Sequence, residues 1–245
     1  MLLPKVIPAG TSYVRISMSK RATMRLLLEA VQRGYQFWSA GLVAPGKALR
    51  FAEKMRTLYD ADHTAAQRAY AKKQGQANAQ LIMFKEGREA DIRYWLLATA
   101  GKGQVHDLEQ LGDAREHRQH LTWGEQYVLR HVQRPRDHGG GRAWTWQLTA
   151  RHYALLEASI AEQAAARGNT HGNTEALAAL VTAILRMPGF YGIRQQGSAR
   201  CSTTAPRFGP VLTARKTLSL GRQRCRISPR PSPVITHRNR CASMC

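Results

Sequence analysis

The segment that most resembles a catalytic motif runs from Gly41 to Ala48 and reads GLVAPGKA. It nearly fits the phosphate-binding loop pattern GxxxxGK followed by Ser or Thr, in which backbone N–H groups hold phosphates and the lysine reaches the terminal ones. Ala48 stands where a hydroxyl would hold magnesium. A Gly-Pro-Gly turn that opens a helix, with Lys47 in its solvated first turn, explains the same residues. We expect this turn and keep a degenerate nucleotide-binding loop as an alternative.

A second pattern would suit an enzyme that transfers DNA strands with a tyrosine nucleophile. His131 and Arg134 form an HxxR element, and Trp144 and Tyr153 follow it. In that chemistry, tyrosine attacks the phosphodiester while arginine and histidine hold the phosphate oxygens. Here a glycine-rich turn and an expected strand separate HxxR from Tyr153, which falls on the apolar face of its expected helix. A core tyrosine is therefore expected, with strand transfer as an alternative.

Two groups of acidic and histidine side chains could ligate a metal: Asp60, Asp62 and His63, and Glu116, His117 and His120. Both groups lie in polar, arginine-rich stretches, where surface charge pairs are the ordinary explanation. The sequence has no HExxH element. We therefore assign no catalytic residue, no metal ligand and no cofactor.

Apolar residues at helical spacing indicate helices on both sides of a β-rich middle. Ser19 and Asp62 are the expected N-caps of the first and third helices, and Thr149 that of the fourth. The expected helices cover residues 19–33, 45–59, 62–73, about 150–160 and 174–187. The expected hairpins pair 81–84 with 92–99, and 127–132 with 142–148 across Gly139–Gly141.

This order of elements predicts an α+β fold in one domain over residues 1–195. Its N-terminal helices precede two central β-hairpins that form a small antiparallel sheet, and two C-terminal helices follow. Residues 196–245 contain ten Lys or Arg and no Asp or Glu, with scattered prolines, so we expect a disordered basic tail. Two interpretations of the tail stay open: an arm that adds affinity for nucleic acid, or a frame-shifted end with no selected role.

The positive charge is the strongest indication of function. The chain has 37 Lys and Arg against 16 Asp and Glu, a net charge of +21, and without the tail the remainder still carries 27 basic residues, or +11. Such a charge is usually neutralised by a polyanion, most commonly nucleic acid. No segment is apolar for the length of a membrane span, and all four cysteines lie in the last 45 residues. We expect a cytoplasmic protein without a membrane partner.

Basic residues gather on the first helix, the third helix and the second hairpin. The predicted nucleic-acid-binding residues are Lys20, Arg21, Arg25, Arg68, Lys72, Lys73, Arg130, Arg134 and Arg136. We expect phosphate contacts, with DNA preferred to RNA as partner. A third possibility is an interaction module for an acidic protein, and the sequence leaves the oligomeric state open.

Several phrases resemble those of proteins encoded on integrative conjugative elements and plasmids of Proteobacteria. They are KALRFAEK from Lys47, AQRAYAKK from Ala66, YWLL from Tyr94, WTW from Trp144 and RMPGF from Arg186. The resemblance covers about residues 12–195. It implies a mobile genetic element and an accessory role in its replication, transfer or regulation, and it supplies no catalytic residues.

Overall fold

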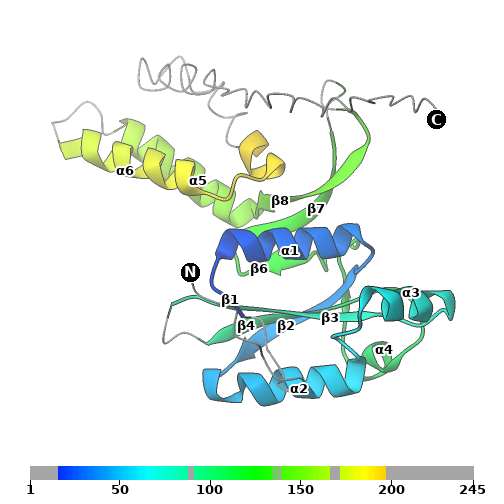
Figure 1. The fold of residues 1–245 in the computed structure, drawn as a ribbon. Coiled ribbons are helices and arrows are strands. Elements are labelled where there is room, and N and C mark those ends of the chain that lie inside the picture. Colours follow the sequence, from blue (N-terminus) through cyan, green and yellow to red (C-terminus); the bar gives the residue numbers. More distant parts are fainter. Residues whose placement is uncertain (1–15, 88–90, 135, 137–138, 166–171, 197–245) are drawn as a thin grey trace, which may run out of the picture. The chain divides into compact units, whose positions relative to one another are not determined.

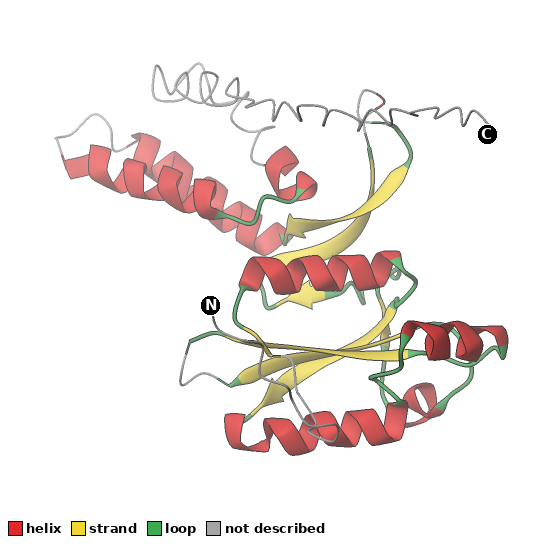
Figure 2. Ribbon diagram, in the orientation of Figure 1, coloured by secondary structure: helices red, strands yellow, loops and turns green. Residues whose placement is uncertain are grey.

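The computed structural model describes residues 16–87, 91–134, 136, 139–165 and 172–196 (Figures 1 and 2). All of them belong to the first of the chain's two units, Met1–Ser202. The tail predicted over residues 196–245 lies, except for Gln196, outside the described residues. Helices alternate with the strands of two separate sheets, so the predicted α+β class is confirmed.

The larger sheet has its strands in the order β1-β3-β4-β2-β5. These strands are β1 (Ile16–Ser17), β3 (Ala79–Lys85), β4 (Ile92–Ala98), β2 (Phe37–Val43) and β5 (Gly112–Asp113). Strand β1 runs parallel to β3, and the other neighbours are antiparallel. At the centre of the sheet, Trp95 pairs with Ile82 on one side and with Ala40 on the other.

Helix α1 (Lys20–Gln32) packs on one face of this sheet. The side-chain oxygen of Ser19 accepts a hydrogen bond from the Ala22 N–H at 3.3 Å, which satisfies a free donor of the first turn. Leu27 is fully buried in the same cluster as Trp95 of β4. The predicted cap and apolar stripe are therefore both confirmed.

The opposite face of the sheet packs against other helices, so both of its faces are buried. These helices are α2 (Ala48–Tyr59) and α4 (Gln104–Leu108), and a 3₁₀ turn η1 (Pro45–Lys47) precedes α2. Leu96 packs with Met55 of α2, whereas its neighbour Leu97 belongs to the cluster around α1. Because successive side chains of a strand point to opposite faces, residues 94–98 of β4 form a continuous apolar run.

The N-cap of helix α3 (Ala65–Lys73) is Thr64 and not the predicted Asp62. Thr64 and Gln67 form a reciprocal capping box, with the Thr64 N–H donating to Gln67 Oε1 at 2.8 Å. Asp62 lies instead in the turn between α2 and α3. The capping box satisfies the backbone N–H groups of Thr64 and Gln67, which explains why Thr64 is the N-cap.

The smaller sheet is antiparallel, in the order β6-β7-β8. It consists of β6 (Thr122–Trp123), β7 (Tyr127–Gln133) and β8 (Arg142–Leu148), and it leads into helices α5 (Ala150–Ala165) and α6 (Gly172–Arg186). Thr149 caps α5 as predicted, because its Oγ1 accepts from the His152 N–H at 3.2 Å. Residues 191–196 are again helical and lie against β8.

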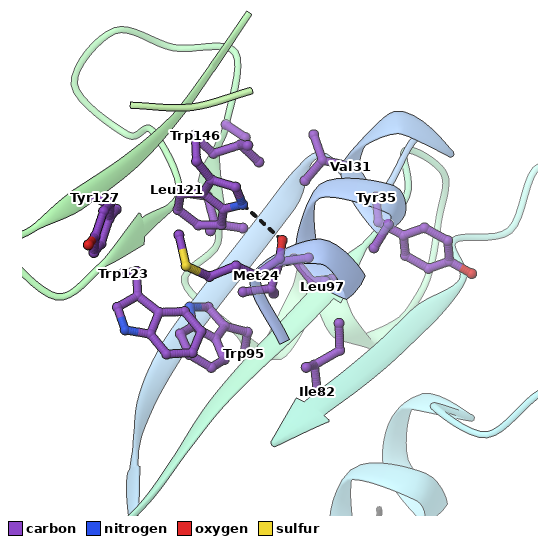
Figure 3. Packing of buried hydrophobic residues seen from close by; sticks show 14 of the residues in the cluster. Met24, Val31, Tyr35, Ile82, Trp95, Leu97, Leu121, Trp123, Tyr127 and Trp146 are labelled. Atoms are coloured by element: carbon purple, nitrogen blue, oxygen red, sulfur yellow. Dashed lines mark hydrogen bonds between the residues drawn. The ribbon is translucent and has the colours of Figure 1, made fainter. Parts of the chain in front are cut away.

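Tryptophans join α1 to both sheets (Figure 3). The Trp146 indole N–H donates to the Met24 carbonyl oxygen of α1 at 2.8 Å. Trp95 and Trp123 stack with ring centroids 4.7 Å apart, and the Trp95 indole N–H reaches the Thr122 carbonyl at 3.4 Å. Trp95 and Trp146 are fully buried.

The arrangement of the hairpins differs from the prediction. Both exist, but β3–β4 belongs to the larger sheet and β7–β8 to the smaller one, so they do not form a single small sheet. Strand β2 was not predicted: its residues 37–43 were assigned in part to the phosphate-loop-like motif. Within the described residues, no helix is both long and apolar enough to cross a bilayer.

Candidate nucleic-acid interface

The β7–β8 hairpin passes from buried to exposed along its length. At its base, Leu129 and its cross-strand partner Trp146 are both fully buried. Farther along, Gln133 and its partner Arg142 are both exposed. Figure 1 shows the two strands curving away from α1 toward their joining turn. We call residues 131–134, 136 and 142–144 the outer hairpin.

The outer hairpin is cationic. Its three arginines, Arg134, Arg136 and Arg142, are all exposed, and the one acidic residue in the sequence between β7 and β8, Asp137, lies outside the described residues. Arg142 donates from Nη2 to the His131 carbonyl oxygen at 3.0 Å, while the Arg134 N–H donates to Gly141 at 2.7 Å. Arg142 was missed at the sequence level, although it pairs directly with Gln133, next to Arg134, in the predicted hairpin.

Arg130 belongs to the base of the hairpin. It pairs across the strands with Thr145 and is half-buried. Among the described residues, its Nε is buried without a hydrogen-bond partner. The hydroxyl of Thr145, across the strands, accepts from the Gly192 N–H at 3.0 Å. A buried N–H without a partner is costly. The structure thus separates Arg130 from Arg134 and Arg136, with which it was predicted to cluster at one surface.

The aromatic side chains of the outer hairpin contact each other. His131 and Trp144 stack with ring centroids 5.0 Å apart and an interplanar angle of 25°. Trp144 is half-buried and packs against the main core. Because His131 covers one face of the indole, that face is closed to a stacking base. These two residues of the HxxR-type pattern therefore make a structural contact.

Lys20 of α1 is held against aromatic rings. Its Nζ donates to Gln126 Oε1 at 3.0 Å and lies 4.7 Å from the centroid of the Tyr127 ring. Burial lowers the pKa of the Lys20 ammonium; the Glu86 carboxylate raises that pKa, and the positive charge of Arg93 lowers it. Lys20 thus joins α1 to the β6–β7 turn, and Arg93 is a neighbouring cation that sequence reasoning missed.

The other two cations predicted on α1 are exposed. Arg25 Nε lies 2.9 Å from Glu29 Oε1, an i,i+4 ion pair that partly neutralises it. Such a pair between exposed side chains contributes about 0.3–0.5 kcal/mol, so it yields readily to a stronger anion. Arg21 and Arg25 therefore remain accessible to phosphate.

The cations predicted on α3 have structural roles of their own. Arg68 is half-buried, and its Nη1 donates to the His63 carbonyl oxygen at 2.5 Å. Lys72 and Lys73 are exposed in the last turn of α3, where positive charge complements the helix dipole. Figure 1 shows α3 well separated from the turn end of the β7–β8 hairpin. The nine predicted residues therefore do not form a single cluster.

The phosphate-loop-like motif does not form a loop over its length. Gly41 lies within β2, paired with Tyr94 of β4, and the strand continues to Val43. A Cβ on Gly41 would approach Tyr94 Oη to 2.8 Å, so contact with this ring explains the glycine. The expected turn that opens α2 is confirmed at η1, where Pro45 occupies the first turn and Lys47 is exposed.

Within the described residues, the side chains considered for strand transfer and for metal binding do not come together as a site. Tyr153 packs against the main core, as expected of a core tyrosine. Asp60 Oδ1 lies 3.7 Å from His63 Nε2, and the rings of His117 and His120 are 5.8 Å apart. Across the part of the chain that the structure describes, no three His, Cys, Asp or Glu residues come together as metal ligands.

Comparisons of the chain with protein-family models, with curated proteins and with solved structures gave no match.

Proposed function

We propose that the protein binds nucleic acid, mainly through phosphate contacts made by the arginines of the outer hairpin. The observation that carries the proposal is the exposure of Arg134, Arg136 and Arg142 on one two-stranded ribbon, whose residues 127–148 include four arginines and a single acidic residue, Asp137. Guanidinium groups bind phosphate through paired hydrogen bonds, and they displace condensed counterions. Arg21 and Arg25 on the exposed side of α1 supply further positive charge.

The shape of the outer hairpin favours DNA as the partner. The major groove of B-DNA, about 12 Å wide, admits a two-stranded β-ribbon. The deep, narrow major groove of A-form RNA does not admit protein side chains in the same way. Binding to single strands depends on exposed aromatic rings that stack with bases, whereas Trp144 is half-buried and already stacked on His131. Duplex DNA is therefore the proposed ligand.

The wider role is proposed on the resemblance alone. Short phrases between Lys47 and Phe190 resemble those of proteins encoded on conjugative elements and plasmids. We propose an accessory protein of such an element, acting on DNA in the cytoplasm in replication, transfer or regulation. The proposal includes no catalytic step.

Salt-titrated binding of the full chain to a labelled DNA duplex tests the proposal. In Arg134→Gln/Arg142→Gln we expect affinity to fall on the order of 10- to 100-fold near 0.1 M salt. The slope of log affinity against log salt concentration should become shallower by about 2, since each lost phosphate contact contributes about 0.9.

A matched control removes the same charge from α2. Arg50 and Lys54 are both exposed there, and Arg50→Gln/Lys54→Gln should retain the slope of the parent protein. If the two variants lose equal affinity, or if the hairpin variant binds as the parent does, the hairpin is not the binding element.

A further inference from the structure

Helices α5 and α6 expose apolar side chains that a surface helix usually buries. In α6, nine of the fifteen residues are Ala, Leu, Val or Ile. Among the α5 and α6 side chains whose exposure is described, none is buried. Leu155 is 57% exposed and Leu185 is 61% exposed. A helix this apolar normally packs against a core or a partner.

Among the described residues, the contacts of the two helices with the main core lie at one end of the pair. Tyr153 and Leu156 near the start of α5 pack against the main core, as does Met187 just after α6. Beyond these anchors, α5 and α6 pack against each other, and Figure 1 shows them side by side as a pair. The pair therefore has a fixed base, and close to this base Leu155 and Leu185 are exposed to solvent.

Charge distinguishes this pair from the rest of the chain. Residues 150–186 contain three arginines and three glutamates, a net charge of zero in a chain of +21: Arg151, Arg167, Arg186, Glu157, Glu162 and Glu175. The whole surplus of positive charge thus lies elsewhere in the sequence. A neutral apolar surface does not suit a polyanion, because phosphate binding requires cations.

We infer that the α5–α6 pair is the surface through which two copies of this chain associate, helix pair against helix pair. Two chains of +21 repel each other wherever their cationic surfaces meet, and the neutral pair is the segment where they can meet without that repulsion. Four helices packed in this way bury their apolar faces in a shared core. A two-fold contact would bring the same residues, Leu155 and Leu185, to the interface from both copies.

This association does not depend on nucleic acid, so it can be tested separately from the proposed function. The full chain, treated with nuclease, is measured by sedimentation equilibrium in about 0.5 M salt, where electrostatic contacts are screened. We expect twice the monomer mass of 27.4 kDa. Leu155→Glu/Leu185→Glu should sediment as a monomer, because four glutamates would face each other in the apolar contact.

The control places the same substitutions on other exposed leucines. Leu49 and Leu108 are 54% and 63% exposed on α2 and α4, and Leu49→Glu/Leu108→Glu should remain a dimer. A parent chain that is monomeric at 0.1 mM (roughly the concentration at which a weak dimer would still form) overturns the inference. So does a dimer that persists in Leu155→Glu/Leu185→Glu.

Circular dichroism shows whether the glutamate variant keeps its helices. If it loses them, the milder Leu185→Gln decides the matter. It should weaken dimerisation about tenfold, the equivalent of about 1.4 kcal/mol. An unchanged dissociation constant in Leu185→Gln overturns the inference.

Discussion

At the scale of single residues, Tyr59 at the end of α2 has the most strongly shifted pKa among the described side chains. It is 8% exposed, and its Oη donates to Glu109 Oε1 at 2.6 Å. Burial, together with the hydrogen bond to Glu109 and the charge of that carboxylate, raises the pKa of Tyr59 to about 12. Since Glu109 follows α4, the bond joins α2 to that segment. The pair is a structural contact between two elements on one face of the larger sheet.

The raised pKa of Tyr59 predicts a pH dependence of stability. The unfolded chain releases this proton near pH 10, whereas the folded protein keeps it to about pH 12. The stabilisation is therefore complete below pH 10 and is lost as the pH rises from 10 to 12. In Tyr59→Phe, the free energy of unfolding should be about 1–3 kcal/mol lower at pH 7, because the bond to Glu109 is lost.

Urea denaturation of the full chain at a series of pH values measures this effect. Between pH 10 and 12, the free energy of unfolding should fall less in Tyr59→Phe than in the parent protein. Tyr70, which is 65% exposed on α3, provides the control, and Tyr70→Phe should follow the parent curve. Parallel curves for Tyr59→Phe and the parent would contradict the assignment.

At the scale of elements, local patterns located most helices and strands, and the failures have physical causes. The Ser19 cap and the apolar spacing through Leu27 are local signals, and α1 forms as predicted. Strand β2 was missed because Ser39 and Gly41 interrupt its apolar residues. At Gly41 a side chain would collide with the Tyr94 ring of β4. Because β4 is distant in the sequence, no local pattern reveals this contact.

The segment 191–196 protects the edge of the smaller sheet, because β8 is its last strand. The Gln196 side chain accepts from the Leu148 N–H at 2.8 Å and donates to the Leu148 carbonyl at 3.2 Å, as a neighbouring strand would. Gly192 allows this approach: a Cβ there would lie 2.6 Å from the Trp146 carbonyl oxygen and 2.7 Å from Thr145 Cγ2.

Gly192→Ala should therefore separate this segment from β8. We expect the free energy of unfolding to fall by about 1–3 kcal/mol, the usual cost of overpacking a close contact. Gly46→Ala is the control, since a Cβ at Gly46 would meet no atom within 4 Å, and it should change stability by less than about 1 kcal/mol. Urea denaturation of the two variants measures the difference; equal stability would show that Gly192 tolerates a side chain.

At the scale of the whole molecule, two features were hardest to predict from the sequence: the sheet to which each hairpin belongs, and which basic side chains are exposed. Both hairpins follow from alternation and turn residues, but their assignment to separate sheets depends on α1, which packs between distant strands. The candidate site was foreseen in part. The sequence predicted Arg134 and Arg136 as binding residues because both lie in one hairpin. Arg142 could be added only once the strand register was known. The packing of Lys20 against Gln126 could be seen only in the tertiary fold.

We propose that the exposed arginines of the outer hairpin contact DNA phosphates. Arginine-selective chemical modification of the full chain, with and without duplex DNA and read by mass spectrometry, tests it residue by residue. Arg134, Arg136 and Arg142 should become protected when DNA is bound, whereas Arg50 on α2, which is also exposed, should react as before. Unchanged reactivity of Arg134 and Arg142 in the DNA complex would contradict the account.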